Sequence, residues 1–220
     1  MKTFLISILT LFIGFSLNAQ VTEGSITYEV EVEMDEEEYQ MVKSMFGDMT
    51  MTNHFSSKGS RIDIDMGFMS TTAIVETGND EVLVLMDMFG MKNYMVSSAS
   101  DYKDDQGFDS DVKPVRTTST KEIAGYECIE YEYETESLDK ISIWVSEELV
   151  PETSSPNVPD GLNGMPLEFS SKGPQGMIQF KAISVSLEKP SDDLFSTEIP
   201  DGYTEMDLDK IMEMSGGMGK

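Results

Sequence analysis

The chain contains few side chains that can perform covalent or metal chemistry. It has a single cysteine, Cys128, and a single histidine, His54, which lie far apart in the sequence. A catalytic thiol needs a neighbouring base, and a zinc site needs several His or Cys ligands. We therefore predict that Cys128 packs as a small hydrophobic residue, that His54 is structural, and that the protein has no cofactor and no metal site.

Carboxylates are abundant, with 41 Asp and Glu against 15 Lys and Arg and a formal net charge of −26. Paired carboxylates can hydrolyse glycosides, but many of these alternate with apolar residues, a pattern typical of the solvated face of a strand. The five aspartates within residues 98–113 do not have the spacing of a calcium loop. Because the chain contains no nucleophile, zinc or phosphate-loop motif, we predict a protein that is not an enzyme.

The charge and the methionines point to the kind of partner instead. A strongly acidic surface repels nucleic acid and anionic lipid headgroups, so we predict no nucleic-acid binding. The chain has 18 methionines, whose flexible thioethers can line a surface that adapts to apolar ligands or can simply fill a core. Both interpretations stay open. Thioether binding of Cu(I) is a third, for which Met212, Met214 and Met218 are the only candidates.

The N-terminal residues predict export. One lysine precedes an uncharged apolar run over residues 4–15, and small residues lead to Ala19. This is the pattern of a cleaved signal peptide over residues 1–19, and the run is too short for a stable membrane span. No cysteine at the predicted cleavage site is available for a lipid anchor. We expect a periplasmic or extracellular protein that is not lipid-anchored and has no stable membrane insertion after cleavage.

The segment Lys121–Val145 organises the elements that must position any site. Apolar and acidic residues alternate in it on both sides of a short turn, which predicts a β-hairpin with one apolar face formed by Ile129, Tyr131, Tyr133, Ile141, Ile143 and Val145. Trp144 falls on the opposite, otherwise polar face. We therefore expect that face to be covered as well.

Elements on either side of this hairpin follow from the same periodicities. We predict a strand over residues 21–34, an amphipathic helix over 35–49, serial hairpins over 50–97, a solvated loop over 98–113, a proline-rich loop over 146–166 and a closing hairpin over 167–187 with a bulge near Ala182. The run over 82–89 is apolar at successive positions, so both of its faces should be buried, one of them under the helix.

The order of these elements, together with three short motifs, resembles a known family. The motifs are Ile123–Cys128 (IAGYEC), the strand containing Trp144, and Asp193-Leu194-Phe195 ahead of Pro200. They resemble secreted bacterial domains of unknown function of the 4412 type, which are similar to the LolA/LolB-like lipoprotein carriers. The resemblance implies a mainly β (α+β) fold over residues 20–205: a strongly curved antiparallel sheet or incomplete β-barrel with a few short helices on its concave side, followed by a C-terminal helix or tail over 206–220.

In such relatives the concave side holds acyl chains, which implies a binding protein of the periplasm or cell envelope for a hydrophobic small molecule or acyl chain. We predict that residues 146–166 form a movable rim of the binding site. The residues predicted to line this site are Tyr28, Val30, Met45, Met49, Val84, Met86, Trp144 and Phe180. The alternative is a protein-interaction module of the envelope that binds no small molecule and uses an exposed sheet edge or the acidic face.

Overall fold

The computed structural model describes most of the chain as one sheet with two short α-helices and one 3-10 helix. The described residues are 20–33, 35–105, 112–134, 140–153, 159–173 and 176–206. The predicted signal peptide and, apart from Met206, the predicted C-terminal segment lie outside them. No helix among the described residues is long and apolar enough to cross a membrane.

Twelve strands are found in this part of the chain. They are β1 (Gly24–Val32), β2 (Thr50–Ser56), β3 (Gly59–Asp65), β4 (Met69–Glu76), β5 (Glu81–Met88), β6 (Met91–Ser98), β7 (Val115–Ile123), β8 (Tyr126–Glu134), β9 (Lys140–Ser146), β10 (Met165–Gly173), β11 (Gly176–Ser186) and β12 (Thr204–Glu205). Their order in the sheet is β12-β6-β5-β4-β3-β2-β1-β11-β10-β9-β8-β7. Only β12, which runs parallel to β6, departs from antiparallel pairing.

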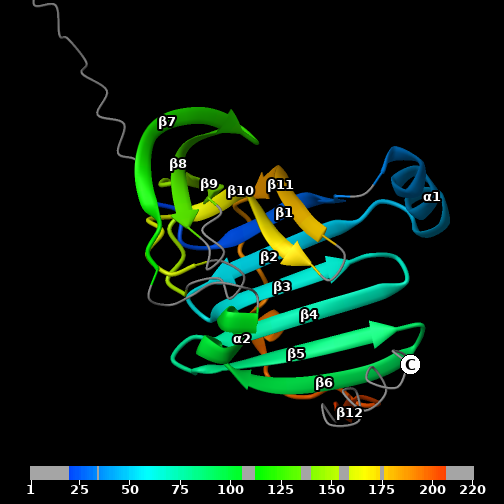
Figure 1. Cartoon of the computed structure of the whole chain (residues 1–220). Coiled ribbons are helices and arrows are strands. Elements are labelled where there is room, and N and C mark those ends of the chain that lie inside the picture. Colours follow the sequence, from blue (N-terminus) through cyan, green and yellow to red (C-terminus); the bar gives the residue numbers. More distant parts are fainter. Residues whose placement is uncertain are drawn as a thin grey trace, which may run out of the picture.

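The sheet is open and strongly curved, which confirms the predicted fold class (Figure 1). Strands β1 to β6 form a broad meander, and β7 to β9 arch over one side of it. We call the face carrying Ile26 and Ile62 the inner face and the opposite one the outer face. Because Ile143 of β9 belongs to the same buried cluster as Ile62 of β3, the arch closes over the inner face without making a closed barrel.

The main core fills the space beneath this arch. Alternation along β1 directs Ile26, Tyr28 and Val30 inward, and each is at most 1% exposed. The Tyr28 hydroxyl donates a hydrogen bond of 2.7 Å to the carbonyl oxygen of Pro166, which joins β1 to the start of β10. Burial raises the pKa of Tyr28, so its hydroxyl stays a neutral donor.

A second, smaller core lies over the meander. Helix α2 (Ala99–Asp105) places Tyr102 on the inner face, against Val75, Val82 and Val84 of β4 and β5. The sequence predicted a solvated loop here, which is wrong for residues 99–105. The short helix was not recognised because it carries aspartates and one buried aromatic residue, with no repeated apolar period.

The predicted helix over 35–49 exists as α1 (Glu36–Phe46), but it does not cover β5. It begins after Asp35, whose carboxylate accepts the Glu38 amide at 2.9 Å, and ends at Gly47, whose φ is 85°. In Figure 1 it lies beyond the ends of β1 and β2. The prediction that it packs under the central strand is therefore corrected, and α2 takes that place.

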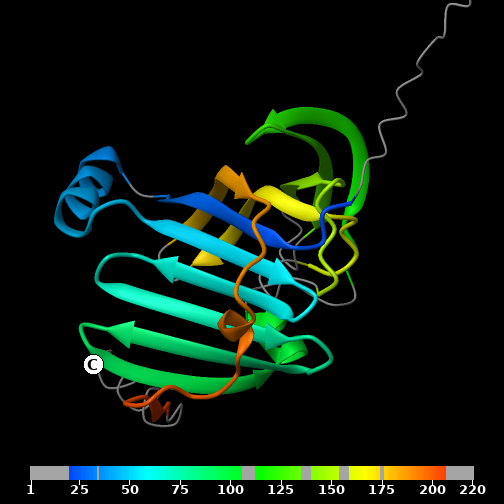
Figure 2. The ribbon, with the colours of Figure 1, turned by 180° about the vertical axis from the view of Figure 1, so that it is seen from behind.

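The outer face is crossed by a C-terminal strap, residues 187–206, which runs from β11 to the edge of β6 (Figure 2). It contains the short helix η1 (Asp192–Phe195), which packs Phe195 against β3 and β4, and it ends where the Met206 amide donates to the Tyr94 carbonyl at 2.8 Å. Leu83 on the outer face and Val84 on the inner face are both buried. The prediction that both faces of the run 82–89 are covered is confirmed for residues 82–85 and is wrong for Met88 and Phe89, which are 41% and 74% exposed.

Candidate functional site

Four of the eight predicted lining residues lie together in the main core. Tyr28, Val30, Met49 and Phe180 are at most 7% exposed. The Phe169 ring stacks on Phe180 with a centroid distance of 4.8 Å and meets Tyr28 edge-on at 6.0 Å. These side chains are therefore packed against other side chains of the protein.

The other four predicted residues lie elsewhere. Val84 and Met86 belong to the core under α2, and Met45 lies on α1, where its side chain is outside the described positions. Trp144 lies on the outer face, and the Lys121 ammonium is 4.1 Å from its ring centroid. That ammonium also pairs with Glu168 at 2.7 Å, so the expected cover of Trp144 is a cation and not a ligand.

The cysteine and the acidic side chains were the groups that the sequence singled out for possible chemistry. Cys128 is buried, and this burial raises the pKa of its thiol to about 11, so the thiol is protonated at neutral pH. Within the described ranges no group of three or more His, Cys, Asp or Glu side chains could hold a metal ion. The aspartate-rich stretch 98–113 lies partly outside those ranges.

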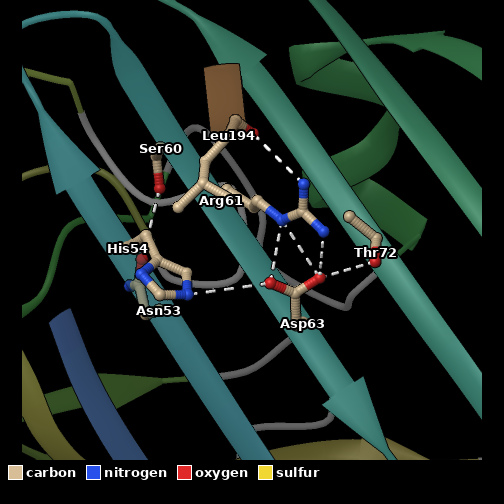
Figure 3. Close-up of polar contacts among 7 residues, drawn as sticks. All are labelled: Asn53, His54, Ser60, Arg61, Asp63, Thr72 and Leu194. Atoms are coloured by element: carbon tan, nitrogen blue, oxygen red, sulfur yellow. Dashed lines mark hydrogen bonds and ion pairs between the residues drawn. The ribbon is translucent and has the colours of Figure 1, made fainter. Parts of the chain in front are cut away.

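A connected polar group lies on the outer face beneath the strap (Figure 3). Asp63 accepts from the Arg61 Nε at 2.8 Å and from the Thr72 hydroxyl at 2.6 Å, and its Oδ2 is 3.8 Å from the His54 Nε2. Arg61 also donates to the Leu194 carbonyl at 3.3 Å. Because the carboxylate is held by a guanidinium, we interpret this cluster as an anchor for η1 and not as a base for catalysis.

His54 in this cluster predicts a pH dependence of stability. Its pKa is lowered mainly by burial, with a smaller contribution from Arg61, against the opposing effect of Asp63. The unfolded chain then binds the proton more tightly, so this contribution is present above about pH 6.5 and is lost as the pH falls through the lower folded pKa. Urea unfolding at pH 7.5 and at pH 5.5 measures this effect. We expect the free energy of unfolding to decrease less between these two pH values for His54→Gln than for wild type. Equal decreases would contradict a role of His54 in the pH dependence.

A set of methionines occupies the inner face of β4, β5 and β6 at the end away from α2. Cross-strand pairing places Met69 opposite Met88 and Met88 opposite Met91, while Met86 and Met95 pack at the border of the smaller core. We call these five residues the methionine face. Met88 is 41% exposed and Met91 is 61% exposed. The face thus grades from a covered core beneath α2 to an open apolar surface at the β5–β6 turn.

Two phenylalanines extend this surface at the hairpin tips. Phe89 is 74% exposed, has a φ of 53°, and precedes Gly90 in the two-residue turn between β5 and β6. Its ring stacks on Phe68 of the β3–β4 turn with a centroid distance of 6.0 Å. A bulky residue rarely adopts positive φ, and such strain concentrates at functional positions. The sequence analysis did not predict either phenylalanine as part of a site. The Phe89-Gly90 pair between two apolar runs is the signal that could have identified Phe89 as an exposed turn residue.

A pocket of about 440 Å³ opens at the same tips. It is lined by Asp65, Gly67, Phe68, Met69, Ser70, Asp87, Phe89 and Gly90. None of the eight predicted residues lines it. It adjoins the methionine face, because Met69 belongs to both and because Phe89 and Gly90 link Met88 to Met91.

The comparison with known families decides where this chain belongs. Residues 37–154, more than half of the chain, match the family described as "Domain of unknown function (DUF4412)". The chain belongs to the DUF4412 family. This confirms the resemblance seen in the sequence motifs. No curated protein matches this DUF4412 chain.

Several solved structures show a distant likeness to the DUF4412 chain. MucB matches with a TM-score of 0.38 and 10% identity over 82% of this chain, which spans only 59% of MucB. The Pseudomonas aeruginosa MucA/MucB complex gives a TM-score of 0.36 and 9% identity, covering 82% of this chain and 57% of the matched chain. A β-barrel-like protein of domain of unknown function DUF1849 from Brucella abortus gives 0.33 and 8%, covering 79% and 100%. At these scores the likeness carries no conclusion about function.

Proposed function

We propose that this DUF4412 chain is an exported, non-catalytic binding protein of the cell envelope, and that its methionine face holds an apolar segment of a protein partner. The observation that carries the proposal is the exposure of Met88 and Met91 at one end of the inner face, with the exposed Phe89 in the turn that joins them. Contiguous exposed apolar side chains, and methionines in particular, are typical of surfaces that accept varied partners.

The open shape of this surface favours a protein segment over a free lipid. Binding sites for small apolar molecules usually enclose most of the ligand surface. The interior residues predicted to do so, such as Tyr28 and Phe180, are buried in contact with their neighbours, so an acyl chain would have to displace them. A protein segment needs only one of its own faces covered.

An acyl ligand is the second candidate function. It is favoured by the same methionines, because their side chains can rearrange around a chain laid on the surface. It would make the DUF4412 chain the lipid-binding protein that the sequence predicts, but with the ligand on the methionine face and not beneath the arch.

Fluorescence anisotropy with synthetic probes distinguishes the two. We expect saturable binding of a labelled peptide of alternating Leu and Arg, and at least tenfold weaker binding when every Leu is replaced by Ser, because the apolar contacts are lost. A fluorescent fatty-acid analogue serves as the second probe. Tight binding of the fatty acid without binding of either peptide would support the second candidate, and equal binding of the Leu and Ser peptides would contradict an apolar site.

A further inference from the structure

The geometry points to a second recognition element beside the methionine face: the pocket at the hairpin tips takes a Lys or Arg side chain, so the partner segment is basic as well as apolar. This inference rests on the proposed function and specifies the partner. It is carried by the charge and the aromatic surface of the pocket.

Two carboxylates flank the pocket in one row across the sheet. Asp65 is opposite Ser70 on β4, and Ser70 is opposite Asp87 on β5, which places all three side chains on the outer face at the hairpin ends. The Asp65 Oδ1 accepts the Gly67 amide at 2.7 Å, and the Asp87 Oδ1 accepts the Gly90 amide at 2.8 Å. These bonds fix the orientation of both carboxylates before any partner arrives.

The pocket supplies no cation for this charge from the described residues. Its lining contains no Lys or Arg, and neither Asp65 nor Asp87 takes part in an ion pair within the described ranges. Lys92 is opposite Asp87 on β6, but its ammonium lies 5.7 Å from the ring centroid of Tyr203 and does not pair with the carboxylate. Among the described residues, the two negative charges therefore face the pocket without a basic partner.

The aromatic side of the pocket suits the same kind of group. Phe68 and Phe89 present stacked rings beside the carboxylates. A guanidinium or ammonium is attracted both to carboxylates and to the face of an aromatic ring, and the planar guanidinium can stack there. A net charge of −26 adds a long-range attraction for basic segments.

The pocket carboxylates are on the outer face and the methionine face is on the inner face, and the two surfaces meet around the β5–β6 hairpin tip. Phe89 lines the pocket and directly follows Met88, and Gly90 directly precedes Met91. A segment that passes around the β5–β6 turn, from the inner face to the outer face, would place apolar side chains on Met88 and Met91 and a basic side chain in the pocket. Apolar contact would then supply most of the affinity, and the cation would supply selectivity.

Anisotropy titrations at one fixed salt concentration test this inference. The probes are the alternating Leu/Arg peptide and the same peptide with every Arg replaced by citrulline, its neutral isostere. The variant Asp65→Asn/Asp87→Asn removes both charges while keeping the Oδ1 acceptors. The control Asp80→Asn/Asp101→Asn removes two exposed carboxylates near α2, at the other end of the sheet.

We expect Asp65→Asn/Asp87→Asn to bind the Leu/Arg peptide about 3- to 10-fold more weakly than wild type, since each ion pair at a partly exposed site contributes modestly. We expect no change for the citrulline peptide and none for the control variant. If Asp65→Asn/Asp87→Asn and the control variant weaken peptide binding equally, the attraction is diffuse and the inference is overturned. Unchanged peptide binding by Asp65→Asn/Asp87→Asn would also overturn it. In either case a strong Leu-to-Ser effect would leave the proposed function standing.

Two other occupants of this surface are distinguishable in the same experiments. Binding to phosphatidylcholine vesicles that depends on Met88 and Met91, without binding of any peptide, would assign the surface to lipid and overturn the inference. Self-association of the full chain by sedimentation, lost in Met88→Asp/Met91→Asp, would assign it to a second copy and would also overturn it.

Discussion

Replacing Tyr28 by alanine is expected to lower the free energy of unfolding by about 3–5 kcal/mol, as is usual for removal of a large aromatic side chain from a packed core. Tyr28 is fully buried, between Met51 on β2 and Ala182 on β11. The substitution also leaves the Pro166 carbonyl without the hydroxyl that donates to it at 2.7 Å. Urea unfolding followed by circular dichroism measures the loss.

Two further variants separate the causes. Tyr28→Phe removes only the hydrogen bond and should cost about 1–2 kcal/mol. Ile183→Ala, on the adjacent strand β11 but 56% exposed, should change stability by less than about 0.5 kcal/mol. A cost below about 1 kcal/mol for Tyr28→Ala would mean that this side chain borders empty space, and it would restore the interior ligand site that the sequence predicts.

The double substitution Met88→Asp/Met91→Asp is expected to weaken binding of the Leu/Arg peptide by more than about tenfold, or 1.4 kcal/mol. Two carboxylates placed in the apolar contact would have to lose water when the Leu side chains arrive, which is costly. The added negative charge would by itself favour a basic peptide, so weakening in spite of it would identify apolar contact as the main source of affinity.

Met41→Asp on α1 is the matched control for the methionine face. Met41 is 62% exposed, as Met91 is 61% exposed, but it lies on a helix beyond the ends of β1 and β2. We expect it to leave peptide binding unchanged and to change stability by less than about 0.5 kcal/mol, and circular dichroism of Met88→Asp/Met91→Asp checks that this variant stays folded. Equal loss of binding in Met41→Asp, or retained binding in Met88→Asp/Met91→Asp, would contradict a site on the methionine face.

Local periodicity was enough to predict most of the strands and their buried faces, but not β7 or β12. The alternation around Tyr131 gives β8 its buried and exposed sides, and Ala124 and Gly125, both with positive φ, form the tight turn that joins β7 to β8. The change of apolar parity near Ala182 predicted a bulge, and the pairing of β1 with β11 skips one residue there, at Ile183. These features depend on residues close together in the chain.

Contacts between distant segments could not be predicted in the same way. Which helix covers β5 depends on the path of the chain after β6. The short α2 has too few apolar residues for its sequence pattern to predict that it packs on β5. The sequence predicted that something covers the Trp144 ring. The residue that does so, Lys121, is on β7, two strands away in the sheet, so it could not be identified from local sequence. A predicted need for burial does not identify what provides it.

For the same reason, the sequence predicted only part of the candidate site. The abundance of methionine suggested an adaptable apolar surface, and Met86 was among the predicted residues. The predicted helix was expected to cover these methionines, however, so their exposure was not foreseen. The Phe68–Phe89 stack and the pocket beside it arise where two separate hairpin tips meet, a juxtaposition set by the meander.

Methyl NMR of the full chain labelled at its methionines tests the central claim most directly. Titration with the Leu/Arg peptide is predicted to shift or broaden the resonances of Met86, Met88, Met91 and Met95 and to leave those of the buried Met49, Met51 and Met165 unchanged. Perturbation of the buried set, with the methionine face unaffected, would place the ligand beneath the arch and contradict this account.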